Sequence, residues 1–593
     1  MVTSSFIHPG LGFLALAAIL PFLRGKWWNW LLLAPPLLAI FAVFTMQPGD
    51  HMSLRWLGVP LELGRVDKLS VVFAQVFAIM SLAGMLYAMH VQERGQHIAA
   101  ALYVAGGFGC VFAGDYLSLF VFWELMSIGS TFLVLLHRTR ESVLAGFRYF
   151  LSHTAGGLLL LAGLLLRHQA LGTWDFTSVG PQGAALYDWL ILAGFCVNAA
   201  VVPLHAWLPD AYPRSTVTGG VFMCAYTTKT AVYVLARGFA GWEVLAAAGT
   251  VMAVYGVLYA CIENNARRIL SYHIVSQVGY MVAGIGIGTA MTLNGAVAHA
   301  YAHILYKGLL FMGTGCLLYA AGTTKLDELG GLVARLPWVM VLYMVAALSI
   351  SGMPLFNGFI SKTMTINGAA EAHHSLVALG LEIAAVGTFI SVGLKLPYFA
   401  FWGGRPTSMK RALRPIPWNM YAGMTLLAVL CMAQGVAPSI LYEHLPYTVA
   451  HPYEPWTAWH VLQTLLLLGF SGLAFRMLIK VITPHAGLNL DFDFFYRAAG
   501  RFVLACLCRP LAWLDDRWTE AYRVGGLRGL MAMATGSSWF DRKAIDGFVD
   551  GSAHMVEGIG KAGARTQDAD LQDYLALAAI IVACIYGLVW YVG

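Results

Sequence analysis

The apolar run between Ala296 and Phe311, AVAHAYAHILYKGLLF, carries three titratable side chains at intervals of four residues: His299, His303 and Lys307. On a helix, residues spaced by four share one face and rise about 6 Å per step. Because imidazole titrates near neutrality, this spacing predicts a column of proton-exchanging groups. A zinc site is disfavoured, since no Glu stands between the histidines and no third ligand is obvious. Simple core packing of the two histidines stays open.

More ionisable residues lie inside apolar stretches. They are Glu124, Lys229, Lys362 and Lys395, with His153 as a weaker case. Each costs several kcal/mol at the centre of a bilayer unless it is paired or hydrated. The structural alternative is a Lys–Glu pair that only joins two helices, but Glu124 and Glu382 are too few for four lysines. Unpaired lysines must be neutral part of the time, and such a lysine can relay a proton.

The composition places these groups in a membrane protein. Of the 593 residues, 59% are hydrophobic and only 11% are charged, against about 25% charged in soluble domains. Mean hydropathy is +0.69. Nine cysteines with little paired spacing make a disulfide framework improbable. The net charge of +6 follows from basic loops and needs no nucleic-acid partner.

A bilayer core of about 30 Å requires about 20 apolar residues per helix. This window predicts about 14–16 transmembrane helices in an all-α polytopic fold. The first apolar run, 6–23, is interpreted as a transmembrane helix because it lacks a basic n-region and a cleavage site. The candidate spans start near residues 5, 27, 69, 97, 116, 143, 187, 216, 243, 270, 292, 338, 374, 418, 457 and 573.

Basic residues in short loops set the orientation of a membrane protein. With the N-terminus outside, fifteen basic residues fall in inside loops and five in outside loops. The inside residues are Arg24, Lys26, Arg94, Arg138, Arg140, Arg148, Arg214, Arg267, Arg268, Lys325, Arg335, Arg405, Lys410, Arg411 and Arg414. The outside residues are Arg55, Arg65, Lys68, Arg167 and Arg237. We therefore expect a multi-pass protein of a bacterial cytoplasmic (inner) membrane with its N-terminus outside.

The segment 481–572 differs from the rest because it mixes charges with aromatic residues. Leu511, Leu514, Trp518 and Tyr522 recur at helical spacing. This pattern predicts an amphipathic helix on the cytoplasmic side, lying at the interface or against partner subunits, before an anchor helix at 573–593. A loosely ordered cytoplasmic loop is the alternative, and the aromatic content argues against it.

Two spans contain helix-breaking residues. VVPLHAWLPDAYP holds Pro203 and Pro209, and LSISGMPLFNGFISK holds Pro354 and Gly358. Broken helices at membrane depth line cavities, and matching breaks in two halves indicate inverted repeats. The predicted organisation is N-terminal helices over 1–96, five-helix repeats over 97–237 and 243–400, and additional helices over 401–480.

Several stretches together resemble a known family. They are FVFWELMSIGS around Glu124, PLHAWLPDAY, TTKTAVYVLAR around Lys229, RRILSYHIVSQVGYM, HAYAHILYKGLLF and GFISK. They resemble the antiporter-like subunits shared by respiratory complex I and Mrp-type cation/proton antiporters, over most of 60–410. Lys229 and its context resemble the middle-sized complex I antiporter-like subunit and the D subunit of Mrp antiporters. FDRKAIDGF and TQDADLQDYLALA resemble the tail of the largest complex I antiporter-like subunit, where a lateral helix precedes an anchor helix.

The resemblance implies roles for individual residues. Lys229 would be the central lysine, His299, His303 and Lys307 the connecting column, and Lys362 the exit group, with Lys395 where members often have a basic residue. In the family the glutamate equivalent to Glu124 pairs with a lysine five residues before Pro203. Here that residue is Asn198, which cannot carry a proton charge. Lys229 or His153 would then substitute. His205 and Arg267, in the resembling stretches, are further candidate modifiers.

These observations predict a proton-translocating subunit of a multi-subunit assembly, with H⁺ as the transported ion and Na⁺ as a candidate counter-ion. The partners would be other membrane subunits, contacted partly through 481–572, and the lipid bilayer. A divergent Mrp-type antiporter is favoured slightly over a complex I or hydrogenase-type subunit, and an inorganic-carbon uptake complex or a non-conducting scaffold ranks lower. No flavin, quinone, iron–sulfur or metal motif occurs, so we expect no cofactor in this chain. A haem protein is also disfavoured, because His299 and His303 on one helix face cannot coordinate one haem iron from opposite sides.

Overall fold

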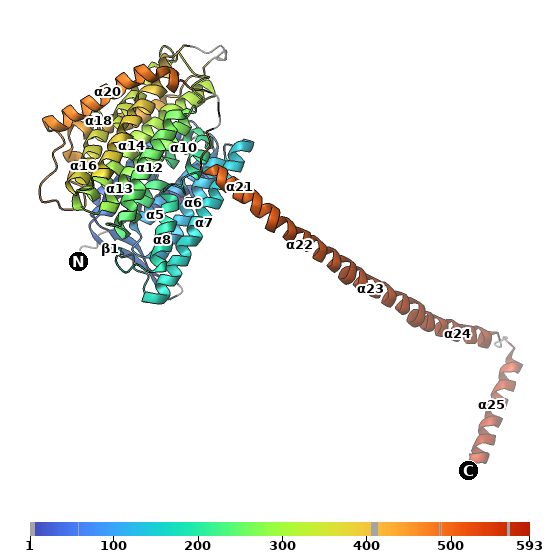
Figure 1. Ribbon diagram of the computed structural model, residues 1–593. Coiled ribbons are helices and arrows are strands. Elements are labelled where there is room, and N and C mark those ends of the chain that lie inside the picture. The colour runs from blue at the N-terminus through green and yellow to red at the C-terminus, as the bar shows by residue number, and fades with distance from the viewer. Residues whose placement is uncertain are drawn as a thin grey trace. The chain divides into compact units, whose positions relative to one another are not determined.

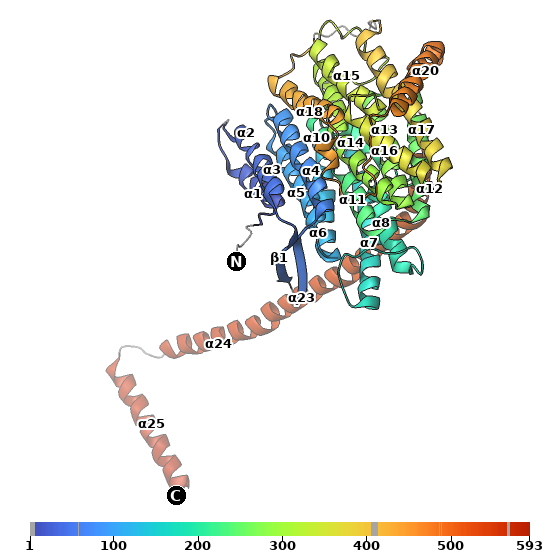
Figure 2. The same ribbon diagram turned by 90° about the vertical axis from the view of Figure 1, so that its left-hand side faces the viewer.

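The computed structural model describes residues 6–25, 27–56, 58–404, 413–485, 487, 489–565 and 570–592. The chain forms two compact units, residues 1–493 and 494–593. Four basic residues used above to predict the orientation lie outside the described residues: Lys26, Arg405, Lys410 and Arg411. In Figures 1 and 2 the helices of the first unit stand side by side in one bundle.

The described part of the chain holds 11 helices that are long and apolar enough, by length and composition, to cross a membrane. Three shorter apolar helices, 9–22, 186–198 and 337–351, accompany them. Every one of the predicted spans coincides with a helix or with an interrupted helix. The prediction of an all-α polytopic membrane protein is therefore confirmed, because apolar runs in a bilayer must satisfy their backbone groups internally.

The N-terminal region contains a short β-hairpin that apolar windows do not predict. Strand β1 (Gly49–Trp56) pairs antiparallel with β2 (Val59–Val66), with Gly49 opposite Val66 and Trp56 opposite Val59. The side chain of Asp67 then caps the following helix by accepting a hydrogen bond from Ser70 N. The helices of this region are α1 (Pro9–Ile19), α2 (Trp28–Leu31), α3 (Ala34–Thr45) and α4 (Lys68–Ala88).

The first four helices of the next two groups follow a similar order of lengths. The first group comprises α5 (Arg94–Phe112), α6 (Tyr116–Leu135), α7 (Arg140–Leu171), α8 (Leu186–Asn198), α9 (Trp207–Ala211), α10 (Val217–Met223) and α11 (Thr227–Gly238). The second comprises α12 (Glu243–Ile262), α13 (Ala266–Ile287), α14 (Ala290–Ala321), α15 (Pro337–Ser351), α16 (Asn357–Glu371) and α17 (Ser375–Thr388), which continues in π-helical turns at Phe389–Lys395 and Tyr398–Trp402. In each group a 32-residue helix, α7 or α14, precedes an interrupted one.

Two isolated β-bridges occupy matching places in these groups. Asp115, which caps α6, pairs with Asp175 after α7, and Asn265, which caps α13, pairs with Lys325 after α14. The two long helices also both end on a left-handed glycine. These parallels agree with a repeat, and the inverted relation of the halves and the predicted domain limits stay predictions.

The remaining helices of the first unit are α18 (Trp418–Val436), α19 (Ser439–Tyr442) and α20 (Ala458–Ile482). After them come α21 (Asp493–Val503), α22 (Arg509–Ala521), α23 (Gly529–Phe540) and α24 (Gly547–Ala564), joined by π-helical turns, and then α25 (Leu571–Val592). Figure 1 shows α22, α23 and α24 following one another as an elongated rod, which we call the arm. The predicted helix in 481–572 is therefore helical over most of its length rather than a loose loop.

Candidate functional site

The column on α14 has the geometry that its spacing predicts. His299, His303 and Lys307 are all fully buried in the first unit. The ring centroids of the two histidines lie 6.2 Å apart, about one helical turn. The edge of the Tyr306 ring contacts His303 at 5.3 Å between centroids. The helix thus presents one continuous titratable face inside the bundle.

Two members of this column lack hydrogen-bond partners in the described part of the chain. Lys307 Nζ and both ring nitrogens of His303 have no hydrogen-bond partner among the described residues. Buried polar groups are normally paired with protein or with ordered water. A buried ammonium without a counter-ion is also expensive, and no fixed ion pair holds Lys307 among the described residues.

His299 connects the column to the second broken helix. Its Nδ1 lies 3.1 Å from Ser361 Oγ on α16, and its Nε2 lies 3.4 Å from the Tyr306 hydroxyl. Ser361 directly precedes Lys362, which is also buried. The column therefore contacts α16 at the residue next to Lys362 in sequence.

The second break supplies a hydrogen-bond acceptor for Lys362. Helix α15 ends at Ser351, followed by Gly352 with a left-handed φ of 78° and by Pro354. Lys362 Nζ donates to the carbonyl of Ile350 at 2.6 Å and lies 5.2 Å from the centroid of the Tyr280 ring. At Gly358 an added Cβ would lie 1.7 Å from Ser349 O, so this glycine permits the close approach of α15 and α16.

Lys229 has the same arrangement at another break. Helix α10 ends at Met223 and α11 begins at Thr227. Lys229 Nζ donates to the freed carbonyl of Cys224 at 2.8 Å and to Thr228 Oγ1 at 3.0 Å. In both halves a lysine is thus held by helix-break oxygens instead of by an acidic side chain.

At the first broken helix, the structure pairs Asn198 directly with His153. Asn198 ends α8, and its Oδ1 lies 2.8 Å from His153 Nδ1 on α7. The imidazole packs between Tyr149 and Trp207, at centroid distances of 4.2 and 4.5 Å. Pro203 lies in the interruption and Pro209 lies in α9. His153 therefore occupies the side of α8 where a lysine at 198 would have placed its charge.

Glu124 lies on α6, half-buried, with Oε1 unpartnered among the described residues. It packs on Gly157 of α7, where an added Cβ would lie 2.3 Å from Oε1. His153 is one turn earlier on α7. No hydrogen bond or ion pair joins Glu124 to Lys229 in the described part of the chain, so the predicted grouping of these two is not a direct contact.

Arg267 and Lys395 both bind backbone carbonyls. Arg267, fully buried, donates to the carbonyl of Ser215 at 2.8 Å and to its Oγ at 2.9 Å, which fixes the loop before α10. Lys395 Nζ donates to the carbonyls of Cys261 and Glu263 at 2.7 and 2.8 Å, at the end of α12. These contacts make Arg267 a positioning residue and place Lys395 apart from Lys362.

Two further buried polar residues, His273 and Gln277, were not among the predicted site residues. For His205, which was, the sequence did not predict a partner. His273 on α13 lies 2.7 Å from Ser391 Oγ, and Gln277, one turn on, accepts from Tyr306 at 3.4 Å. Both are fully buried. The spacing of four between them, in an apolar span, is the same signal that revealed the α14 column. His205 lies 3.2 Å from Asp491.

A cavity of about 50 Å³ opens beside Lys362. Its polar lining includes Glu382, Asn367, His460 and Gln463. Gln463 Nε2 donates to Glu382 Oε1 at 2.9 Å, and Asn367 Nδ2 lies 2.8 Å from His460 Nε2. Lys362 thus lines a small chamber whose walls also include a carboxylate and an imidazole.

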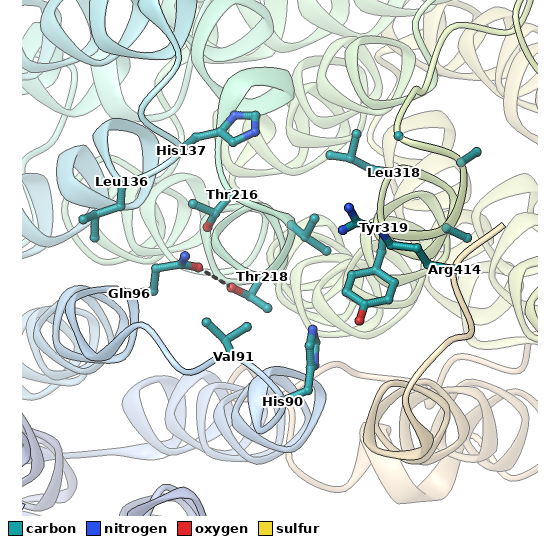
Figure 3. A pocket seen from close by; sticks show the side chains of 14 residues that line it. His90, Val91, Gln96, Leu136, His137, Thr216, Thr218, Leu318, Tyr319 and Arg414 are labelled. Carbon is teal, nitrogen blue, oxygen red and sulfur yellow. Dashed lines mark hydrogen bonds between the residues drawn. The ribbon is translucent and has the colours of Figure 1, made fainter. Parts of the chain in front are cut away.

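A larger cavity of about 440 Å³ lies where several helices end, at loops rich in basic residues. Figure 3 shows His90, His137, Tyr319 and Arg414 around it. Thr218 donates to Gln96 Oε1 at 3.1 Å across its wall. The cavity adjoins the C-terminal end of α14, the helix that carries the column.

No group of three or more His, Cys, Asp or Glu side chains with a metal-binding arrangement occurs among the described residues. The expectation that this chain holds no cofactor stays a prediction.

Comparison with known proteins agrees with this architecture. Residues 113–391 match the family model described as NADH:quinone oxidoreductase/Mrp antiporter, TM. The D component of the Na⁺/H⁺ antiporter of Alkalihalophilus pseudofirmus is 30% identical, covering 55% of this chain and 68% of that protein. Hydrogenase-4 component B of Escherichia coli is 29% identical, covering 65% of each chain. The chain therefore belongs to the family of NADH:quinone oxidoreductase and Mrp antiporter membrane subunits.

A solved structure extends the likeness over nearly the whole fold. A chain of the archaeal membrane-bound sulfane sulfur reductase, a respiratory membrane complex, superposes with a TM-score of 0.69 over 98% of this chain and 99% of that chain, at 21% identity. This likeness concerns the fold. Among curated relatives, the matches cover from 51% to 68% of the relative's length for the first three.

Proposed function

We propose that this chain is a proton-translocating membrane subunit of a multi-subunit Mrp-type cation/proton antiporter or complex I-like assembly. The observation that carries the proposal is the buried run His299–His303–Lys307, in which His299 contacts Ser361, the neighbour of Lys362 on α16. Family membership supports it, since relatives include a Na⁺/H⁺ antiporter component.

The chemistry of the run suits proton transfer. No acidic side chain forms an ion pair with Lys229, Lys307 or Lys362 in the described part of the chain. A charge on any of them is costly at membrane depth, so a proton passes through rather than resting there. Water molecules between His303 and Lys307 would satisfy their free nitrogen atoms and complete the relay.

The cavities suggest where the path opens. The cavity in Figure 3 reaches Leu318, about 16 Å along α14 from Lys307, and supports access from the side of the basic loops. The chamber beside Lys362 supports release through Glu382 and His460. Lys395 does not line this chamber, so Lys362 is the favoured exit group.

Partner subunits would control the path from outside the chain. Glu124 is half-exposed on α6, where a neighbouring subunit could change its charge state. The arm exposes large apolar side chains, among them Leu511, Leu514 and Trp518, which suit contacts with other membrane subunits. The basic-residue bias supports a bacterial cytoplasmic membrane location with the N-terminus outside.

The test is proton flux in proteoliposomes that contain the whole complex, driven by a pH gradient and separately by a Na⁺ gradient. We expect Lys307→Ala to abolish flux and Lys480→Ala, at an exposed lysine on α20, to leave it unchanged. If Lys307→Ala retains full flux, the column is structural and the proposal fails.

A second candidate is redox-driven pumping, with the chemistry in other subunits. The similarity to hydrogenase-4 component B favours it. The same proteoliposomes separate the two: flux that requires an electron donor and acceptor indicates redox coupling, whereas flux driven by Na⁺ alone indicates antiport.

A further inference from the structure

The chain between α20 and the arm folds back into the first unit. Residues 489–492 lie against α12 and α13, and the Asp491 side chain is only 1% exposed. Tyr259 donates to the carbonyl of Leu490 at 2.9 Å. This docked segment ends where α21 begins, at Asp493.

The Asp491 carboxylate is held by donors from two helices. Tyr255 of α12 donates to Oδ1 at 2.5 Å and Tyr272 of α13 donates to Oδ2 at 2.7 Å. The backbone N–H of Phe492 donates to Oδ1 at 2.6 Å. The orientation of the carboxylate is therefore fixed, and both of its oxygens are engaged.

The carboxylate faces the first broken helix. His205, in the interruption between α8 and α9, places Nε2 at 3.2 Å from Asp491 Oδ1. The imidazole is fully buried, with the Tyr255 ring edge-on at 4.8 Å. Neither ring nitrogen has a hydrogen-bond partner among the described residues, so the approach of Nε2 to Asp491 is an ion-pair contact.

We infer that His205 and Asp491 form a proton-holding dyad in the transport path, completed by the segment that precedes the arm. With the carboxylate 3.2 Å from Nε2, the neutral ring carries its N–H on that nitrogen, and the Nδ1 lone pair is the base. A proton arriving at Nδ1 forms one N–H bond, and the resulting imidazolium is neutralised by Asp491. When the proton leaves Nδ1, that N–H bond breaks and the imidazole is neutral again.

A purely structural latch explains the geometry less well. It would gain nothing from leaving a buried ring nitrogen unpartnered, since such an atom is costly. The two tyrosine contacts use separate carboxylate oxygens, so they are compatible with either role. A base beside a fixed counter-charge needs such an unpartnered nitrogen.

The other charges around the dyad have partners of their own. Arg268 lies 3.4 Å from Glu263, and Lys395 is held by carbonyls. On α9, Asp210 pairs with Arg148 and Arg214. Asp493 also stands near Arg268. The charge that changes at this place is therefore that of His205.

The position of Asp491 in the chain links the dyad to movement of the arm. Because Asp491 lies two residues before α21, any displacement of the arm that pulls on residues 489–492 would remove the counter-charge from His205. The dyad thus connects the segment that leads into α21 with the first broken helix, in the half of the protein that lacks a lysine at 198. The inference rests on the proposed function.

The experiment measures proton flux per assembled complex in proteoliposomes, between about pH 6 and 9. We expect Asp491→Asn and His205→Gln each to lower flux on the order of tenfold or more and to alter its pH profile, with no additional loss in the double variant. Asp491→Glu should restore part of the flux. Tyr259→Phe removes one hydrogen bond from the same segment and should leave flux and profile unchanged.

Unchanged flux and pH profile in Asp491→Asn or in His205→Gln would overturn the dyad. His205→Gln keeps the tyrosine contacts of Asp491, so it tests the dyad even if Asp491→Asn fails to assemble. Lys307→Ala is measured alongside: loss of flux there with wild-type flux in the dyad variants refutes the dyad alone, whereas full flux in Lys307→Ala refutes the proposed function.

Discussion

Gly157→Ala tests whether the position of the Glu124 carboxylate relative to α7 matters for transport. The added Cβ would lie 2.3 Å from Glu124 Oε1 and 3.2 Å from its Cδ. Since non-bonded atoms do not approach within about 3 Å, the carboxylate must move by roughly 1 Å away from α7. The substitution should not destabilise helix α7, because alanine favours a helix over glycine by about 1 kcal/mol.

A displacement of this size should be costly for proton transfer. Misplacing a reacting group by about 1 Å costs up to a hundredfold in rate, so we expect flux to fall on the order of tenfold to a hundredfold. The assay is dye-monitored proton uptake in proteoliposomes, normalised to assembled complex. Gly146→Ala is the matched control, since its Cβ would lie 2.6 Å from Leu135 Cδ2 on the same pair of helices, without Glu124 nearby.

A second substitution distinguishes displacement of the Glu124 carboxylate from a general disruption of the protein. Glu124→Asp shortens the side chain by one methylene, so the double variant Glu124→Asp/Gly157→Ala should recover part of the flux that Gly157→Ala loses. Wild-type flux in Gly157→Ala would show that the position of the carboxylate against α7 has no part in transport, and the reasoning about Glu124 would then be wrong.

Three further results are expected. Lys362→Gln keeps a hydrogen-bond donor but removes the charge, so flux should fall on the order of tenfold or more at unchanged complex yield. Gly358→Ala places a Cβ 1.7 Å from a backbone oxygen and should destabilise the protein by about 1–3 kcal/mol or more in thermal unfolding, whereas Gly469→Ala, with nothing within 4 Å, should not. Burial alone would raise the pKa of Asp491, but contacts from His205 and two tyrosines lower it well below its usual range. The docked segment should therefore stay protected from protease above the ordinary carboxyl value of about 4 and loosen only as the pH falls through the lowered value; in Asp491→Asn the protection should be weaker at neutral pH.

Much of the fold followed from local patterns. Apolar runs located the helices because a span must be apolar wherever it faces lipid. The breaks near Pro203 and Pro354 were visible because proline and glycine interrupt backbone hydrogen bonding. The hairpin 49–66 was not visible, since it lies between spans where hydropathy carries no strand signal. The arm was predicted from its spacing of aromatic residues and is helical.

The candidate site divides in the same way. The α14 column could be read from the spacing of His299, His303 and Lys307, because helix geometry alone puts such residues on one face. The substitution of Asn198 for a lysine was also legible as a missing charge. The contact of His153 with Asn198 could not be predicted, because the two residues are 45 positions apart in the chain.

The sequence by itself thus determined the membrane class, the places of the helices and the column of titratable groups, all of which depend on periodicity within one segment. Tertiary structure alone decided that both lysines at helix breaks bind freed carbonyls, that Glu124 rests on Gly157, and that Asp491 faces His205. The physical reason is that these contacts join elements far apart in the chain, and only the packing of whole helices brings such partners within hydrogen-bonding distance.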